Sequence, residues 1–266
     1  MNLKQFLSIC LLIILLFVLS ILSQTGGLVL LICLLISLLF KKGALLKSVL
    51  LFFGLYMLST LLLIPALAPA FGREKLNQNE QTCFSSGFIP LLNRNYVTPE
   101  LNTLIRKVSA DMEEYGIKLI YLDANFPFLD GFPLLPHRSH DDGKKLDLAF
   151  VYEDENGHYN EEAMSRSGYG IFEEAKAGEF DQVRDCIDKG NWQYGLTANL
   201  HFGKKKTNMK FSEKGTALLI NSLLRHGAKK IFIEPHLKKR MNLVDSRIRF
   251  HGCAAVRHDD HIHLQL

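Results

Sequence analysis

The sequence lacks the motifs that would place it in several common classes of protein. It contains no CxxC pair, which argues against a zinc site built from thiolates and against a thioredoxin-type redox motif. Lys and Arg residues give a net charge of +4 but are scattered, and no Arg-rich motif with interleaved aromatic residues is present. We therefore predict no nucleic-acid partner. No internal repeat is visible either.

Cysteine is scarce and unevenly placed. Cys10 and Cys33 lie in apolar segments, whereas Cys83, Cys186 and Cys253 lie in the polar remainder of the chain. In an oxidising compartment, two of these last three can form a disulfide and leave one thiol free. The sequence does not say which two.

Charge is almost missing from the first quarter of the chain. Residues 6–23 and 48–71 are apolar and long enough to cross a bilayer, while residues 28–40 are short for a full span. We predict a transmembrane anchor over residues 1–71 with two or three helices. A cleaved signal peptide over residues 1–25 is the alternative, disfavoured because its positive charge is thin and more apolar sequence follows.

Positive charges near the apolar segments predict the orientation of the anchor. Lys41, Lys42 and Lys47 precede the last apolar segment, and such clusters normally stay in the cytoplasm. Arg73 and Lys75, just after that segment, count weakly against this orientation. We predict a multi-pass protein of the cytoplasmic (inner) membrane whose remaining domain lies on the extracytoplasmic, periplasmic side.

The polar remainder reads as a stalk and lead-in segment over residues 72–97, without clear periodicity, followed by one domain over residues 98–266. Helices are expected after the caps Thr98 and Ser212, with a charged helix near 178–189, and the acidic stretch 153–170 is expected to be a surface loop. Strands are expected at residues 117–123, 146–152, 229–234 and 261–266. The predicted fold class is α+β: a small, mainly antiparallel sheet with flanking helices.

Histidines cluster in two places. His137 and His140 precede one predicted strand, whereas His258, His261 and His263 lie within the last nine residues. Side chains alternate along a strand, so His261 and His263 project from the same face, as residues that share a metal site must. A helix would separate them.

A carboxylate completes this pattern. Asp147 lies seven residues after His140, and a turn at Asp142-Gly143 can bring the two together. Imidazole and a single carboxylate suit zinc, and three protein ligands leave the fourth position for water, as in catalytic zinc sites. Each element alone is weak: an HxH pair is often a surface pair, the Asp259-Asp260 pair can be a solvated turn, and His137 can lack a role.

Together, these residues resemble the lysostaphin/D-Ala-D-Ala metallopeptidase group, whose signature is HxxxxxxD followed much later by HxH. The chain is most similar to the penicillin-insensitive murein endopeptidases within that group. Three segments carry the resemblance: HRSHDDG with the following Asp147, IFIEPHLKKRM at 231–241, and RHDDHIHLQL at 257–266. They cover roughly residues 131–152 and 212–266, and the apolar N-terminal segments lie outside the resemblance.

The resemblance implies roles for individual residues. His140, Asp147 and His263 would be the zinc ligands. His261 would be the catalytic histidine, acting as a base or stabilising an oxyanion.

Further residues follow from the same resemblance. His258 and His137 match histidines near that site that contact the ligands or the substrate, and Asp260 is a rival general base. The residues that flank Asp147, Lys144 to Leu146 and Leu148-Ala149, depart from the endopeptidase pattern, which leaves the substrate open. Lys204 to Lys206 can line a groove for an anionic ligand, but a solvated loop is the better interpretation.

The expected function is zinc-dependent hydrolysis of peptide bonds in peptidoglycan cross-links, with Zn²⁺ as cofactor, peptidoglycan or muropeptides as substrate and the bilayer as partner of the N-terminal helices. A D,D- or L,D-carboxypeptidase acting on stem peptides is the nearest alternative. A zinc-binding sensor domain without catalysis is another, because a metal scaffold can persist without turnover.

Overall fold

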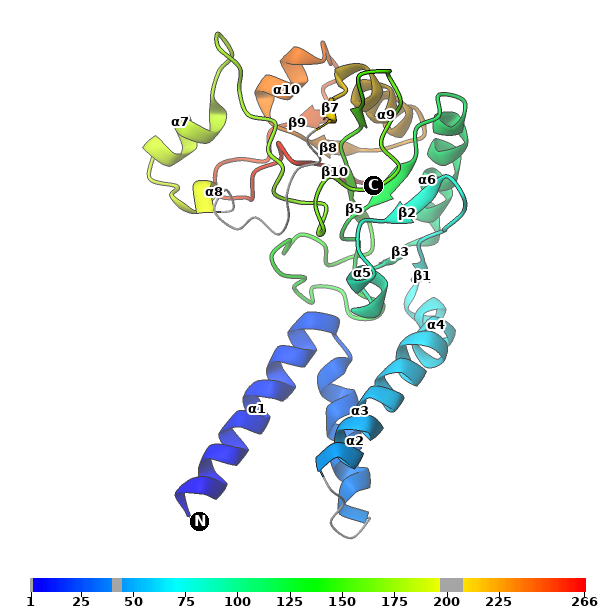
Figure 1. Cartoon of the computed structure of the whole chain (residues 1–266), viewed down its shortest axis with the longest axis vertical. Coiled ribbons are helices and arrows are strands. Elements are labelled where there is room, and N and C mark those ends of the chain that lie inside the picture. The colour runs from blue at the N-terminus through cyan, green and yellow to red at the C-terminus, as the bar shows by residue number, and fades with distance from the viewer. Residues whose placement is uncertain (1, 40–44, 197–207) are drawn as a thin grey trace.

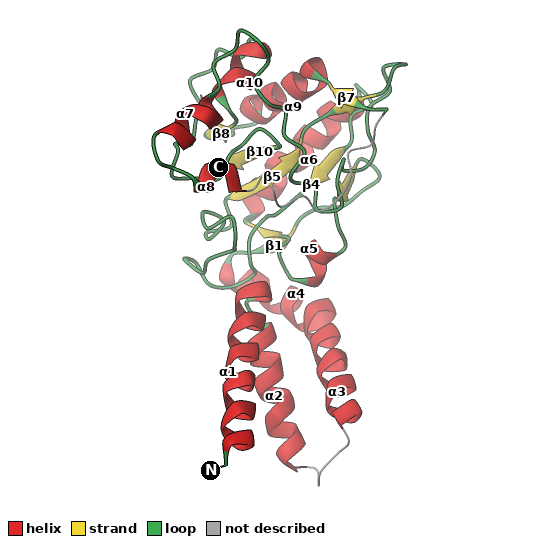
Figure 2. Ribbon diagram, turned by 60° about the vertical axis from the view of Figure 1, so that its left-hand side comes forward, coloured by secondary structure: helices red, strands yellow, loops and turns green. Residues whose placement is uncertain are grey.

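The computed structural model describes residues 2–39, 45–196 and 208–266. Apolar helices form one end of the molecule and an α+β domain forms the other, as Figures 1 and 2 show from two directions. The apolar end consists of α1 (Leu3–Ser23), α2 (Gly26–Leu39), α3 (Leu45–Leu58), the π-helical η1 (Ser59–Leu63), α4 (Ile64–Leu67) and the 3-10 turn η2 (Ala68–Phe71).

Two helical stretches, Leu3–Ser23 and Leu46–Phe71, are long and apolar enough to cross a membrane. Only 6% and 17% of their most apolar 18-residue windows are buried within the protein, so most of their apolar side chains keep exposed surface. The third apolar helix, Gly26–Leu38, is shorter, in line with its short apolar run. Lys41 and Lys42, on which the predicted orientation depends, lie outside the described residues.

The segment predicted as a stalk and lead-in, 72–97, is folded into the domain. It contains β1 (Glu74–Lys75), β2 (Thr82–Phe84), α5 (Phe88–Leu91) and β3 (Tyr96–Val97). The strand β2 pairs with β4 (Leu119–Tyr121) in the main sheet. Such short elements have no room for an amphipathic period, which is why the sequence did not reveal them.

The main sheet has six strands in the order β2-β4-β5-β10-β8-β9. Its other members are β5 (Lys145–Ala149), β8 (Lys230–Phe232), β9 (Ile248–Arg249) and β10 (His261–Gln265). The four central strands are antiparallel, but β2 and β9 each pair in parallel at the edges. The prediction of a small, mainly antiparallel sheet is therefore wrong: the sheet is mixed. A separate ribbon joins β6 (Tyr152–Glu153) to β7 (Lys210–Phe211).

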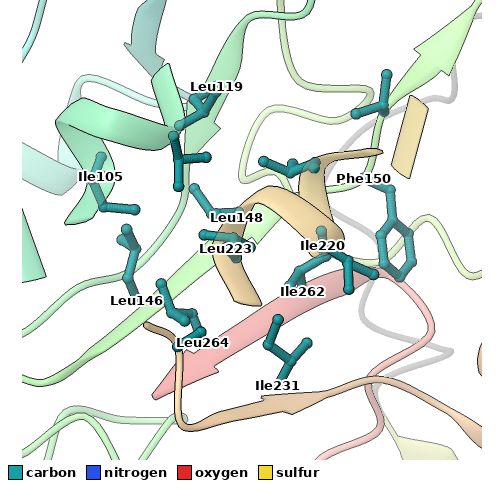
Figure 3. Close-up of a cluster of buried hydrophobic side chains, with 14 of the residues drawn as sticks. Ile105, Leu119, Leu146, Leu148, Phe150, Ile220, Leu223, Ile231, Ile262 and Leu264 are labelled. Atoms are coloured by element: carbon teal, nitrogen blue, oxygen red, sulfur yellow. The ribbon is translucent and has the colours of Figure 1, made fainter. Parts of the chain in front are cut away.

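Two amphipathic helices cover one face of this sheet. They are α6 (Pro99–Glu113) and α9 (Glu213–Arg225), and they begin at the predicted caps Thr98 and Ser212, whose hydroxyl groups accept backbone N–H bonds. Their apolar faces pack on the alternate residues of β5, β10 and β8 (Figure 3). The labelled core residues are Ile105, Leu119, Leu146, Leu148, Phe150, Ile220, Leu223, Ile231, Ile262 and Leu264.

Short helices and a disulfide complete the domain. α7 (Gln182–Asp188) forms within the predicted 178–189 helix, and α8 (Gln193–Leu196) and α10 (Pro235–Arg240) follow. Cys186 and Cys253 form a disulfide and Cys83 keeps a free thiol, which settles the pairing that the sequence left open.

Candidate metal centre

The site lies on the sheet face opposite the core, where β5 pairs with β10. Their register places His263 directly opposite Asp147. Side chains of such directly opposed residues lie on the same face, and Nδ1 of His263 is 2.8 Å from Oδ1 of Asp147. The prediction that His261 and His263 lie on a strand and project from the same face is confirmed, and Ile262 between them points into the core.

His140 reaches the same point from the loop before β5. Its Nδ1 lies 2.7 Å from the carbonyl oxygen of Ala124 and donates a hydrogen bond to it. In this tautomer Nε2 carries the free lone pair and can bind a metal ion. That Nε2 is 3.1 Å from Nδ1 of His263 and 3.2 Å from Oδ1 of Asp147. The turn that brings His140 back is the predicted one: Gly143 has φ +80° and donates its N–H to Asn125.

These three donor atoms suit a cation. A tetrahedral zinc with bonds of ~2.0–2.1 Å separates its ligand atoms by about 3.3 Å, close to the observed 2.8–3.2 Å. His140, Asp147 and His263 are all nearly or fully buried. The cluster can therefore hold a metal ion.

Electrostatics favours the metal-binding forms of two ligands. Burial lowers the pKa of His263 to about 3, although Asp147 opposes it, so the imidazole is neutral and can coordinate. Burial alone would raise the pKa of Asp147, but the histidines around it, led by His140 and His261, hold it well below its usual range. Asp147 is thus a carboxylate.

His261 occupies the side of the site that faces the pocket. Its Nδ1 is 2.5 Å from Oδ1 of Asp260, and the other oxygen of Asp260 accepts the N–H of Gly170 at 2.7 Å. Its Nε2 is buried with no hydrogen-bond partner among the described residues and lies 3.7 Å from Oδ2 of Asp147. Burial would lower the pKa of His261, but Asp147 and Asp260 outweigh it and raise the pKa to about 9.

The remaining predicted histidines surround this group. Nδ1 of His137 lies 3.2 Å from a carboxylate oxygen of Asp123 and 3.2 Å from Oδ2 of Asp147. The His258 ring centroid is 5.0 Å from that of His261, and burial lowers the pKa of His258 well below its usual range. Two further sets of residues that can hold a cation share members with the set His140, Asp147 and His263. One set is His137, Asp147 and His261, and the other is His258, His261 and His263. All seven predicted site residues thus meet in one buried cluster.

Tyr169 and Asp123 were not predicted. The Tyr169 hydroxyl donates to Oδ2 of Asp147 at 2.8 Å, and Asp123 contacts His137. Asp123 ends the predicted strand 117–123, beside the strand that carries Asp147, and that position was an available signal. Tyr169 lies in the acidic stretch expected to be a surface loop, whose end instead folds over the site, and no local pattern marks it.

Glu234, which is not one of the predicted site residues, is also fully buried. Oε1 of Glu234 accepts the Tyr194 hydroxyl at 2.5 Å and the backbone N–H of His258 at 3.0 Å. Burial raises the pKa of Glu234 to about 7. It fixes the backbone just before the final strand.

A pocket of about 720 Å³ opens beside the histidines, with His137, His261 and Asp260 in its wall. Its size lies within the range of small-molecule sites. Lys204 to Lys206, considered as groove residues from the sequence, lie outside the described residues.

No protein-family model matches the chain, and no curated protein matches it. The interpretation of the site therefore depends on its own geometry and on the motifs in the sequence.

Proposed function

We propose that this protein is a membrane-anchored zinc metallopeptidase that hydrolyses peptide bonds in peptidoglycan cross-links. One observation carries the proposal: Nε2 of His140, Oδ1 of Asp147 and Nδ1 of His263 converge within 2.8–3.2 Å, next to His137 and His261, which line a pocket. Two imidazoles with one carboxylate match catalytic rather than structural zinc sites. The motif resemblance supplies the choice of peptide and of peptidoglycan.

Zinc held by these three residues would supply a Lewis acid that makes water nucleophilic near neutral pH and polarises a carbonyl group. The protein's own groups handle the proton. His261 presents its Nε2 toward the site, and because Asp147 and Asp260 raise its pKa to about 9, it is protonated near neutral pH and would donate a hydrogen bond to the developing oxyanion or a proton to the leaving group. Asp260 contacts His261 rather than the pocket centre, so in this proposal it orients and stabilises His261 and is not itself the base.

Two features support a location outside the cytoplasm. Lys47 lies in the first turn of the last helix of spanning length, Leu46–Phe71, which favours a cytoplasmic start and an outward exit of this helix. The Cys186–Cys253 disulfide is of the kind that persists in oxidising compartments such as the periplasm. We propose a multi-pass anchor in the cytoplasmic membrane with the domain on the periplasmic side.

The test uses the full-length protein in detergent. Wild type should bind one zinc and release peptides from purified peptidoglycan, as measured by metal analysis and mass spectrometry. His261→Ala should keep its zinc and lose ~10²–10⁴-fold in rate, the range expected for general acid–base catalysis. His158→Ala, a change at an exposed histidine far from the site, is the matched control and should retain activity.

The products separate the alternatives. Release of cross-linked peptides as monomers supports the endopeptidase, whereas release of single terminal amino acids identifies a carboxypeptidase. If the protein binds zinc stoichiometrically but cleaves no peptidoglycan fraction, the result supports a zinc-binding sensor domain without catalysis. Unchanged zinc content in His140→Ala would refute the metal centre itself.

A further inference from the structure

The surface of the domain next to the anchor is apolar. Phe88 in α5 is 68% exposed and Leu129 is 58% exposed, and Phe71, the last residue of η2 in the adjoining anchor, is 48% exposed. α5 lies at the anchor end of the domain in both Figure 1 and Figure 2. Gln24, at the end of α1, accepts the N–H of Phe128, which places Leu129 at that end too. We call Phe71, Phe88 and Leu129 the membrane-facing patch; exposed apolar groups of this kind mark an interaction site.

Hydrogen bonds fix α5 to the anchor helices. The Tyr56 hydroxyl donates to the carbonyl oxygen of Leu91 at 2.9 Å. The side-chain amide of Asn93, itself fully buried, donates to the hydroxyl groups of Thr25 and Thr60 at 3.4 Å each. α5 is therefore held at the junction between the anchor and the domain.

The same helix forms a wall of the pocket beside the metal centre. Phe88, Ile89 and Leu92 line the pocket of about 720 Å³ that is also lined by His137 and His261. An apolar surface thus runs from the membrane-facing patch, through Phe88, to the histidines. A substrate made only of polar peptide would leave this wall without a partner.

The charged groups of the pocket complement an anion. Arg94 donates to Asp123 at 2.7 Å, and Arg257 is paired with Asp259. Arg166 also lines the pocket, but it is exposed and makes no hydrogen bond or ion pair within the part of the chain that the structure describes. An arginine that is free in this way is suited to a carboxylate or phosphate group.

We propose that the pocket binds a peptide that is itself held in the bilayer by an apolar chain, with the chain along Phe88 and an anionic group of the substrate at Arg166. This inference rests on the proposed peptidase function and narrows its substrate class. The enzyme would act on lipid-linked peptides at the membrane surface in preference to free peptides of the same sequence.

The test compares one cross-linked stem peptide with and without a C16 acyl chain, using full-length protein in lipid vesicles. Sharing a membrane raises the local concentration of the acylated peptide for any variant, so the decisive quantity is the ratio of kcat/KM for the two peptides. Phe88→Ala should lower this ratio about tenfold, as expected for the loss of one ring that the bound acyl chain would cover. Val244→Ala, at a residue 93% exposed and outside the pocket, is the matched control and should keep the ratio.

A second pair of variants tests the anionic group. Arg166→Gln should lower kcat/KM about tenfold for both peptides and leave their ratio unchanged, since charge recognition is independent of the acyl chain. Arg106→Gln, an exposed arginine on α6, is its control. An acylated peptide with a photoreactive diazirine near the start of the chain should crosslink to the segment 86–94.

The outcomes separate this inference from the proposed function. An unchanged ratio in Phe88→Ala, or crosslinks that avoid 86–94, would overturn the lipid-linked substrate while cleavage of the free peptide upholds the peptidase. Crosslinking to 86–94 without cleavage of either peptide would refute the peptidase and uphold the ligand class of the pocket.

Discussion

Strands β5 and β10 present an apolar face and a polar face, and burial affects the free energy of the two in opposite ways. One face carries the core residues Leu146, Leu148, Ile262 and Leu264. The other carries Asp147, His261 and His263. Both faces are buried, but the first stabilises the fold by removing apolar surface from water, whereas the second buries groups that cost free energy until each finds a partner. The comparison teaches that one pair of strands supplies both part of the hydrophobic core and most of the candidate metal centre.

The largest effect is expected at a ligand on the polar face. Four ligands of a structural zinc together account for ~10–16 kcal/mol, so one accounts for about 3–4 kcal/mol, or several-hundred-fold in affinity. His263→Ala should lower zinc affinity by this amount, as measured by competition with a chelator. Without metal, the variant and the wild type should unfold at nearly the same urea concentration. A large loss of stability in the metal-free variant would contradict the view that the polar face contributes little to the stability of the fold.

A neighbouring residue on the apolar face should behave in the opposite way. Leu264→Ala removes a fully buried side chain and should lower the free energy of unfolding by about 3 kcal/mol. Urea unfolding of the metal-free protein measures this, with Val244→Ala as the exposed control, expected to change it by less than ~0.5 kcal/mol. Zinc affinity of folded Leu264→Ala should stay near that of wild type.

The cost of burying a carboxylate near the site should appear as a pH dependence. The pKa of Glu234 rises from 4.5 to about 7 on folding because of burial, so between these values the folded state holds a proton that the unfolded state has lost. The free energy of unfolding should therefore fall as pH rises through this window. Glu234→Gln removes this decline. Relative to wild type, its free energy of unfolding should therefore increase by about 2 kcal/mol as the pH rises from 5 to 8. Equal slopes in parallel urea titrations would contradict the assignment.

The smallest effect is expected where a residue only orients a ligand. Tyr169→Phe removes the hydroxyl that donates to Asp147 and should lower zinc affinity about tenfold, since partners of metal ligands contribute ~10–100-fold. Tyr115→Phe, at a half-exposed tyrosine remote from the site, is the control. A loss as large as that of His263→Ala would mean that Tyr169 belongs among the ligands.

Local spacing was sufficient to predict the polar face. The alternation of His261, Ile262 and His263 follows from strand geometry alone, and the return of His140 to Asp147 follows from the Asp142-Gly143 turn. The capped helices α6 and α9 were predictable for the same reason, because their apolar residues repeat with a helical period.

Features that depend on distant contacts were not predictable. The parallel edge strands β2 and β9 are three and two residues long, too short for a pattern. Tyr169 reaches Asp147 only because a long loop folds back across the sheet. Asp260 was a candidate base by spacing, but its contacts with His261 and Gly170 depend on the whole loop arrangement.

The Cys186–Cys253 bond has a consequence for the segment that leads into the final strand. It joins positions 67 residues apart, and Cys253 lies five residues before His258 in the chain. Until an oxidant has acted, the segment leading into the final strand is tethered by weaker contacts alone. The geometry of His258 and the strand after it would then depend on a covalent bond to α7, a segment that contributes no residue to the histidine cluster.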